Sequence, residues 1–354
     1  MTSADKAVCR LGSHRVVAPE GALPQAAWKL DATPRARANE VLCRVEALNV
    51  DSASFRQIAQ ACDGDCERIG EHIVATVRER GKQHNAVTGS GGMFVGTVAE
   101  VGDDLRATSD LRPGDRIASL VSLTLTPLHV ERVERVDVTT GRVWIEGSAI
   151  LFESGLYAKL PDDIPTDVAL AVLDVAGAPA QVRKLARPGQ TVAVFGADGK
   201  SGMLVCAQAR DRVGPSGRVI GIAPDATTAG ARLLLDEGYV DAFIEVDATR
   251  ALDVADAFEA LAPELADLVV NCVNVAGTEL SSILCAKDDG TVYFFSMSTS
   301  FTAAALGAEG AGKDVTMIVG NGYTKGHAET ALQTLRDHPA LRAYFTERFG
   351  RAGG

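Results

Sequence analysis

The pattern of apolar and polar residues divides the chain into two parts of different character. Up to about residue 160, short β-like runs are interrupted by glycine and proline, as in EVLCRVEALNV, GMFVGTVAEVG, DRIASLV and GRVWI. The segment VGDDLRATSDLRPGDRI reads as strand, loop, Pro-Gly-Asp turn and strand, which predicts a hairpin. A charged insert, FRQIAQACDGDCERIGEHIVATVRERGKQHN, lies between two of these strands and is predicted to be helical.

After Pro165, strands that are apolar throughout alternate with helices. The predicted strands are TVAVFG, RVIGIA, DAFIEV, DLVVNCV, TVYFFSM and VTMIVG. Helices are predicted for SGMLVCAQARDRVG, ATTAGARLLLDEG, VADAFEALAPE, GTELSSILCAKDDG and a terminal segment, AETALQTLRDHPALRAYFTERF. This alternation indicates an α/β protein whose parallel sheet is covered on both faces. We expect one domain near residues 1–165, to which residues 325–354 return, and a second near residues 166–324.

Composition narrows the class of protein. The 354 residues exceed what one hydrophobic core normally supports, and 46% hydrophobic with 23% charged residues is typical of a globular protein. The net charge of -11 disfavours a nucleic-acid partner, because phosphate binding needs a concentrated positive surface. No apolar run approaches the ~20 residues that cross a bilayer, and the start MTSADKAVCR lacks the layout of a signal peptide. We therefore expect a cytoplasmic protein with no membrane partner.

The seven cysteines are widely scattered and have apolar neighbours, which predicts reduced and mostly buried thiols. Cys62 and Cys66 form the only close pair. Without a second pair they do not match a zinc site.

A glycine-rich turn, Gly196-Ala197-Asp198-Gly199-Lys200-Ser201-Gly202, joins the strand TVAVF to the next helix. Glycines in such a turn allow close approach of the backbone to a pyrophosphate and close packing of helix on strand. The spacing is GxxGxxG, but its place between a strand and a helix, with a second strand ending near residue 223, predicts a dinucleotide site on a Rossmann sheet. A nucleoside-triphosphatase loop would need a glycine where Val194 stands, which excludes that alternative.

The cofactor depends on the end of the second strand, where an acidic residue would bind the ribose of NAD and a small neutral residue would admit the phosphate of NADP. Asp225 follows that strand two residues late, so it could bind the ribose or face water, and the choice stays open. Asn271, Asn274 and Ser296 fall at the carboxyl ends of later strands, where such sheets bind ligands. They are candidates for contact with the nicotinamide, and helix capping is the alternative.

The motifs VGTVAEVG, LRPGDRI and RPGQTVAVFGADGKSG resemble those of the medium-chain dehydrogenase/reductase superfamily across nearly the whole chain. Three longer stretches, LNVDSASFRQIAQACDGD, VRERGKQHNAVTGSGGMFVGTV and FESGLYAKLP, are similar to the L-erythro-3,5-diaminohexanoate dehydrogenases of lysine fermentation. The resemblance implies a GroES-like β-rich catalytic domain beside the Rossmann domain. It also implies oxidation of the 3-amino carbon of 3,5-diaminohexanoate by NAD or NADP, with hydrolysis to 5-amino-3-oxohexanoate and ammonium. A homodimer is expected.

Zinc-containing members of that superfamily hold their catalytic metal at three places, which here carry Asp51, the run Gly89-Ser90-Gly91 and Asp174. Two carboxylates and a hydroxyl match zinc poorly, and no Cys-x-x-Cys-x-x-Cys lobe is present, so we expect a metal-free site. Asp51 and Asp174 could instead hold the two ammonium groups of the substrate, with Ser90 beside them. The alternative for Asp51 is a cap on the following helix.

His84 is the candidate proton shuttle among the six histidines, and the alternative is a solvated loop side chain. Arg78, Arg80 and Lys82 precede it, and one of them could pair with the substrate carboxylate, unless they form a solvated helix end. His14 is a further candidate for the same site.

Two other functions remain open from the sequence. A zinc-free quinone or enone reductase has the same glycine turn, although a neutral enone would offer the two aspartates no partner. A crystallin-like relative that has lost its chemistry is disfavoured by the polar, glycine-rich segments.

Overall fold

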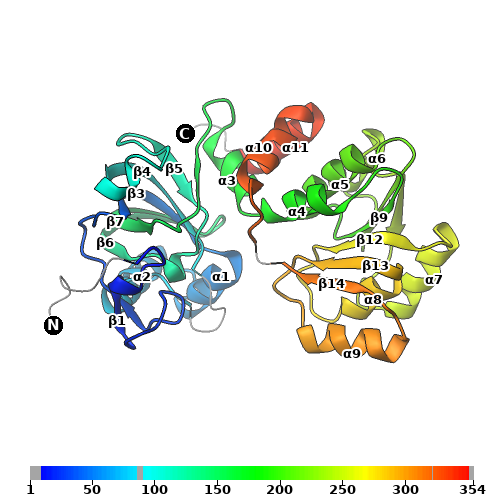
Figure 1. Cartoon of the computed structure of the whole chain (residues 1–354), viewed down its shortest axis with the longest axis horizontal. Helices are drawn as coiled ribbons and strands as arrows, with labels where there is room; N and C mark the ends of the chain where they lie inside the picture. Colours follow the sequence, from blue (N-terminus) through cyan, green and yellow to red (C-terminus); the bar gives the residue numbers. More distant parts are fainter. Residues whose placement is uncertain (1–8, 86–90, 321, 351–354) are drawn as a thin grey trace. The chain divides into compact units, whose positions relative to one another are not determined.

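The computed structural model describes residues 9–85, 91–320 and 322–350. Two compact units divide the chain, Met1–Leu160 and Pro161–Gly354, close to the boundary expected at residue 165 (Figure 1). Within the described ranges, none of the helices combines the length and the apolar character that crossing a bilayer requires.

The first unit is built on an antiparallel sheet of six strands in the order β6-β7-β3-β4-β5-β8. The strands are β3 (Glu40–Asn49), β4 (Met93–Val101), β5 (Arg116–Ser119), β6 (Leu128–Asp137), β7 (Arg142–Phe152) and β8 (Tyr157–Lys159). Helix α2 (Cys66–Arg80) packs against β6 and buries Ile69, Ile73 and Val77, which recur at helical spacing. Helix α1 (Ser52–Ala61) follows β3 directly. The end of β3 and the start of α1 therefore form one corner of this core.

The predicted strands and the helical insert of the first unit are confirmed. The Pro-Gly-Asp turn between β4 and β5 places Gly114 at a φ of 96°, a conformation that favours glycine. Strands β6 and β8 and the small pair β1 (Val16–Ala18) and β2 (Lys29–Leu30) are not predicted from the sequence. The sequence does not predict β6 because it is an edge strand with many exposed charged residues, which makes its apolar pattern weak.

The second unit contains a parallel sheet in the order β11-β10-β9-β12-β13-β14. In chain order this is the 3-2-1-4-5-6 arrangement of Rossmann folds, with the reversal between β9 and β12. The strands are β9 (Thr191–Phe195), β10 (Arg218–Ala223), β11 (Ala242–Glu245), β12 (Ala266–Asn271), β13 (Ala286–Phe294) and β14 (Thr316–Val319). Ligands of such sheets bind at the carboxyl ends of the strands beside the reversal.

Helices cover both faces of this sheet. Figure 1 shows α4, α5 and α6 over one face and α7, α8 and α9 over the other. The helices of the unit are α3 (Thr166–Leu173), α4 (Gly177–Leu185), α5 (Lys200–Val213), α6 (Ala229–Asp236), α7 (Ala251–Leu261), α8 (Glu279–Leu284), α9 (Phe301–Ala311), α10 (His327–Asp337) and α11 (Pro339–Phe349).

Three expectations for the second unit need correction. Residues 325–354 are expected to return to the first unit, but the helices found there group with the second, since α10 packs on α3, α4 and α5, and α11 packs on α3 and α6. The terminal segment is two helices, since Pro339 cannot continue α10 and His338 before it is extended. The helix expected over residues 277–290 ends at Leu284, where sheet pairing begins with Ala286 opposite Ala266.

Candidate active site and cofactor site

The glycine turn lies at the carboxyl end of β9 and opens α5. Gly196 has a φ of 69°, and a Cβ on Gly202 would lie 2.0 Å from the Gly196 carbonyl oxygen, so strand and helix meet too closely for any side chain there. A Cβ on Gly199 would meet only that same oxygen, at 3.2 Å, so the side of the turn at Gly199 is open. The first turn of α5 carries no acidic residue. Its free N–H groups and positive dipole therefore fit a dinucleotide pyrophosphate.

Lys200, the first residue of α5, is paired within the second unit. Its Nζ donates to Asp174 Oδ2 at 2.5 Å, and both side chains are partly exposed. Asp174 is the residue that ends α3. The structure thus brings Asp174, which is expected to hold a substrate ammonium, into direct contact with Lys200 of the predicted dinucleotide turn.

The side chain of Asn271 is fully engaged at the end of β12. Its Nδ2 donates to Thr278 Oγ1 and Ser282 Oγ, both at 2.8 Å, and its Oδ1 accepts from the Val273 N–H at 2.9 Å. Asn271 is also buried. These bonds fix the start of α8, and they favour the structural alternative for Asn271 over contact with a cofactor.

Asn274 and Ser296 meet at the same edge of the sheet. The Ser296 hydroxyl donates to Asn274 Oδ1 at 2.9 Å and accepts from the Ser298 N–H at 3.1 Å. Gly196 lies beside them, since a Cβ built on it would come within 3.3 Å of Val273. The carboxyl ends of β9, β12 and β13 therefore gather the polar groups that a nicotinamide could use.

Asp225 lies exposed just after β10. Its Oδ1 accepts from the Thr227 hydroxyl at 2.6 Å and the Thr227 N–H at 2.7 Å, and these bonds lower the pKa of the carboxyl. Thr228 caps α6 and donates to Asp198 Oδ2 at 3.1 Å, which ties the glycine turn to this loop. Neither of these bonds uses the second carboxylate oxygen of Asp225, so it could still accept from a ribose hydroxyl of NAD. The loop therefore does not decide between NAD and NADP.

Asp51 joins β3 to α1 in the first unit and has two distinct carboxylate oxygens. Oδ1 accepts from the Ser54 N–H at 3.0 Å, so Asp51 does cap the helix. Oδ2 is buried and has no hydrogen-bond partner within the part of the chain that the structure describes. The two hypotheses for Asp51 are therefore compatible, since capping occupies one oxygen and leaves the other for a ligand.

His84 belongs to the same corner of the first unit. Its Nδ1 forms a short hydrogen bond with Thr124 Oγ1. Burial lowers the pKa of His84, and the charges of Arg80 and Lys82 lower it further, so the ring is neutral at neutral pH. A Cβ on Gly91 would lie 2.9 Å from the Thr124 nitrogen, and one on Gly92 would lie 2.8 Å from the Asp51 nitrogen.

The adjacent residues Gly91 and Gly92 thus bring the surroundings of His84 and Asp51 together. The candidates Gly89 and Ser90 lie outside the described residues. Among those described, no group of three or more His, Cys, Asp or Glu side chains is placed to hold a metal ion. A metal-free site stays a prediction.

Two of the three cations before His84, Arg80 and Lys82, are held by specific contacts, whereas Arg78 is exposed. Lys82 is fully buried and donates to the Pro24 carbonyl at 2.8 Å, and burial lowers its pKa to about 8. Arg80 donates to the Trp28 carbonyl at 2.6 Å and stacks on that indole ring. Both residues hold the loop that carries His84 against the segment around residues 24–28.

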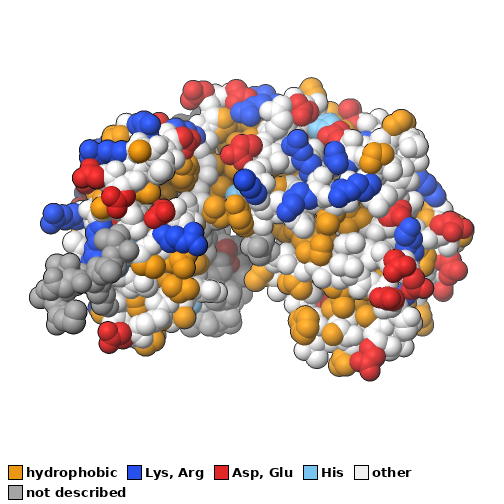
Figure 2. Space-filling model, in the orientation of Figure 1, with side chains coloured by type: hydrophobic (Ala, Val, Ile, Leu, Met, Phe, Trp, Pro, Cys, Tyr) orange, Lys and Arg blue, Asp and Glu red, His pale blue; other side chains and the backbone are white. Residues whose placement is uncertain are grey.

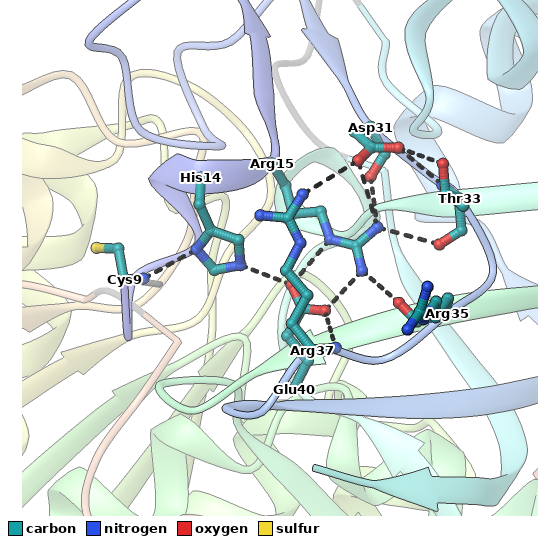
Figure 3. Close-up of polar contacts among 8 residues, drawn as sticks. All are labelled: Cys9, His14, Arg15, Asp31, Thr33, Arg35, Arg37 and Glu40. Carbon is teal, nitrogen blue, oxygen red and sulfur yellow. Dashed lines mark hydrogen bonds and ion pairs between the residues drawn. The ribbon is translucent and has the colours of Figure 1, made fainter. Parts of the chain in front are cut away.

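His14 belongs to a buried network that sequence reasoning missed (Figure 3). Glu40 accepts from His14 Nε2 at 2.7 Å and from Arg15 Nε and Nη2 at 2.8 and 2.6 Å. Arg15 also donates to the carbonyls of Asp31, Thr33 and Arg35, so all five of its N–H groups have acceptors. Burial by itself would raise the pKa of Glu40, but the hydrogen bonds from Arg15 and His14 outweigh it and lower the pKa to about 2.

This network is saturated, and it fastens the N-terminal segment to β3. His14 Nδ1 accepts from the Cys9 N–H, so Nε2 carries the proton that is donated to Glu40. With both ring nitrogens occupied, His14 has a structural role. Nothing in a single sequence marks Arg15 and Glu40 as partners, because they are far apart along the chain and belong to different elements.

Comparisons with known proteins agree with this architecture. A family model described as the L-erythro-3,5-diaminohexanoate dehydrogenase N-terminal domain matches residues 14–161. Solved structures with the same fold include a mycobacterial quinone oxidoreductase (TM-score 0.51, 19% identity, 89% of this chain and 82% of that one). Another is a quinone oxidoreductase from Coxiella burnetii (TM-score 0.52, 17% identity, 91% and 90%). A third is a mycobacterial protein in complex with NADPH (TM-score 0.52, 18% identity, 91% and 84%).

The expected fold class, a Rossmann sheet with a GroES-like β-rich domain, is confirmed. Two curated relatives are much more similar in sequence. L-erythro-3,5-diaminohexanoate dehydrogenase of Acetoanaerobium sticklandii is 51% identical over 96% of this chain and 99% of its own. The enzyme of the same name from Fusobacterium nucleatum is 51% identical over 96% of this chain and 98% of its own. Since the identity extends through both units, the chain belongs to the L-erythro-3,5-diaminohexanoate dehydrogenase family, whose named members are oxidoreductases.

Proposed function

We propose that this chain oxidatively deaminates L-erythro-3,5-diaminohexanoate with NAD or NADP, giving 5-amino-3-oxohexanoate and ammonium in lysine degradation. The relatives' name supports the substrate. The observation that carries the proposal in the structure is Oδ2 of Asp51, which is buried and has no partner among the residues that the structure describes. A carboxylate oxygen left without a donor is complementary to an ammonium group, which supplies three donors and a positive charge.

The chemistry determines what the surrounding groups must do. Hydride can leave C3 only after the C3 ammonium has lost a proton, because the nitrogen lone pair stabilises the iminium ion that forms. Asp51 holds this ammonium, and His84, neutral because burial lowers its pKa, is the group able to accept the proton. The bound nicotinamide supplies the hydride acceptor. Water then adds to the iminium carbon and the C–N bond breaks. From one substrate, one oxidised cofactor and one water, the products are one ketone, one reduced cofactor, one ammonium ion and one proton.

The cofactor would be held at the switch point of the second unit. The open turn at Gly199 and the N-terminus of α5 are placed for the pyrophosphate, and Asn274 with Ser296 for the nicotinamide end. The fold relative solved with NADPH is compatible with a nicotinamide cofactor in this kind of sheet. Titrating NAD and NADP separately distinguishes the two.

We also propose a cytoplasmic homodimer that uses the outer edge of β14. In the described part of the sheet β14 pairs only with β13, and large apolar side chains are exposed nearby, namely Met297, Phe301, Leu306 and Val319. Figure 2 shows hydrophobic side chains on the surface over α9. A cytoplasmic location is supported by the free state of all seven cysteines. Light scattering on the purified protein tests the dimer.

One experiment tests the function directly. Formation of reduced cofactor is assayed in parallel with 3,5-diaminohexanoate, lysine, β-lysine and simple alcohols, and oxidation of NAD(P)H with a quinone. Activity confined to 3,5-diaminohexanoate, with release of ammonium, supports the proposal. Turnover of quinones without amine oxidation would favour the reductase alternative, which the low identity to the quinone oxidoreductases does not itself support.

A further inference from the structure

Gln83 lies in the loop after α2, next to His84, and its side chain is 1% exposed. Its Oε1 is buried and has no hydrogen-bond partner in the described part of the chain. Leaving a buried acceptor unsatisfied is unfavourable by roughly 1–3 kcal/mol, so proteins rarely retain one without a use. The position is therefore a candidate for contact with a ligand that brings its own donor.

The backbones of Gln83 and Asp51 both approach the glycine pair Gly91-Gly92. A Cβ on Gly91 would lie 2.5 Å from the Gln83 carbonyl oxygen, and a Cβ on the next residue, Gly92, would lie 2.8 Å from the Asp51 nitrogen. The loop and the corner between β3 and α1 thus close around two consecutive glycines. Gln83 Oε1 and Asp51 Oδ2, which lack a partner among the described residues, are both acceptors.

The donors in the adjoining loop residues already have partners. The Lys82 ammonium donates to the Pro24 carbonyl, and Asn85 Nδ2 donates to Gln57 Oε1 at 2.8 Å. A buried acceptor that lacks a donor among the described residues is unfavourable, and a cation with several N–H groups can satisfy more than one such acceptor. A molecule with two ammonium groups matches this pair of acceptors.

We propose that Gln83 binds the C5 ammonium of the substrate, the one that does not react, and so selects a diamino acid over a monoamino acid. This inference rests on the proposed function. The assignment follows from the chemistry of the two side chains. The reacting amine must give up a proton, which suits a carboxylate beside a neutral histidine. The amine that stays protonated needs only a neutral acceptor, and an amide oxygen cannot remove its proton.

The test compares two substrates, 3,5-diaminohexanoate and 3-aminohexanoate, which lacks the C5 amine. Gln83→Met keeps the length of the side chain and removes the acceptor. It should raise KM for the diamino substrate about ten- to a hundredfold, as expected for a lost hydrogen bond to a charged group, and leave 3-aminohexanoate unaffected. Gln83→Glu restores an acceptor and should keep the preference for the diamino acid. NAD(P) affinity should be unchanged, and Tm should stay level or rise, because an unsatisfied group has been removed.

A matched control uses Asn39, whose buried Oδ1 is also unpartnered among the described residues but lies at the other end of β3. Asn39→Leu should leave KM for both substrates at the wild-type value. Equal losses with both substrates in Gln83→Met, or a lowered Tm that accounts for the lost activity, would overturn the proposal. A wild-type enzyme that does not oxidise 3,5-diaminohexanoate would overturn the proposed function itself, and that result is visible before any variant is made.

Discussion

Replacing Asp51 with asparagine separates the two roles that its carboxylate oxygens have. The asparagine side chain keeps an oxygen for the Ser54 N–H, now 3.0 Å from Asp51 Oδ1, and asparagine caps helices about as well as aspartate. The second atom becomes an NH₂ group, which donates where the substrate ammonium needs an acceptor. Capping therefore survives this substitution, and recognition of the cation does not.

The size of the effect follows from the kind of bond that is lost. A hydrogen bond between a carboxylate and an ammonium contributes roughly 1.5–3 kcal/mol, which is about ten- to a hundredfold in kcat/KM. Facing two donors toward each other adds to that loss. The free energy of unfolding should change by less than about 0.5 kcal/mol, since the cap is retained.

The assay is steady-state kinetics with the diamino substrate together with thermal melting and NAD(P) titration. Asp51→Ala is the matched control, because it removes the cap as well and should lower stability by roughly 0.5–2 kcal/mol. Wild-type kcat/KM in Asp51→Asn would refute the assigned role and leave Asp51 as a helix cap alone. A large loss of cofactor affinity in the same variant would also refute it, since the assigned role concerns the substrate ammonium alone.

Three further predictions concern the glycine turn, the buried network and the histidine. Gly199→Val should weaken NAD(P) binding with little change in Tm. Gly202→Val should lower Tm, because its Cβ would lie 2.0 Å from the Gly196 carbonyl oxygen. Equal melting temperatures of the two variants would contradict this prediction. Glu40→Gln should lower the free energy of unfolding at neutral pH by about 3 kcal/mol. This value follows from the difference between the pKa of Glu40 in the folded state, about 2, and its ordinary value of 4.5. That contribution is complete above pH 4.5 and is lost as the pH falls toward about 2, so chemical denaturation across this range should show a steeper decline for wild type than for the variant. The acid limb of kcat/KM should lie below the ordinary histidine value of 6.5 and vanish in His84→Gln; an acid limb unchanged by the substitution would exclude His84 as the proton acceptor.

Most strands and helices of both units could be predicted because the patterns that specify them are local. Uniformly apolar strands alternating with helices indicate a parallel sheet, and the glycine turn identifies β9 as its first strand. The failures have a different origin. Helices α10 and α11 could not be assigned to their unit from the sequence. Their packing partners, α3 to α6, are set by long-range contacts that no local pattern records.

The site residues, too, divide into those that a local pattern predicts and those that only the folded structure brings together. The glycine turn could be found from its spacing and its place between a strand and a helix. The ion pair of Lys200 with Asp174 could not, because the two residues come from different elements and meet only in the folded unit. Gln83 lacked any signal, since a buried glutamine is recognised as unusual only when its surroundings are known. Asp51 shows why the distinction matters. Its sequence context predicts a cap and is satisfied by one oxygen, and only the structure reveals that the other oxygen is buried with no donor among the described residues. An unsatisfied atom is a property of three-dimensional surroundings, so a function that depends on one has to be inferred from the fold.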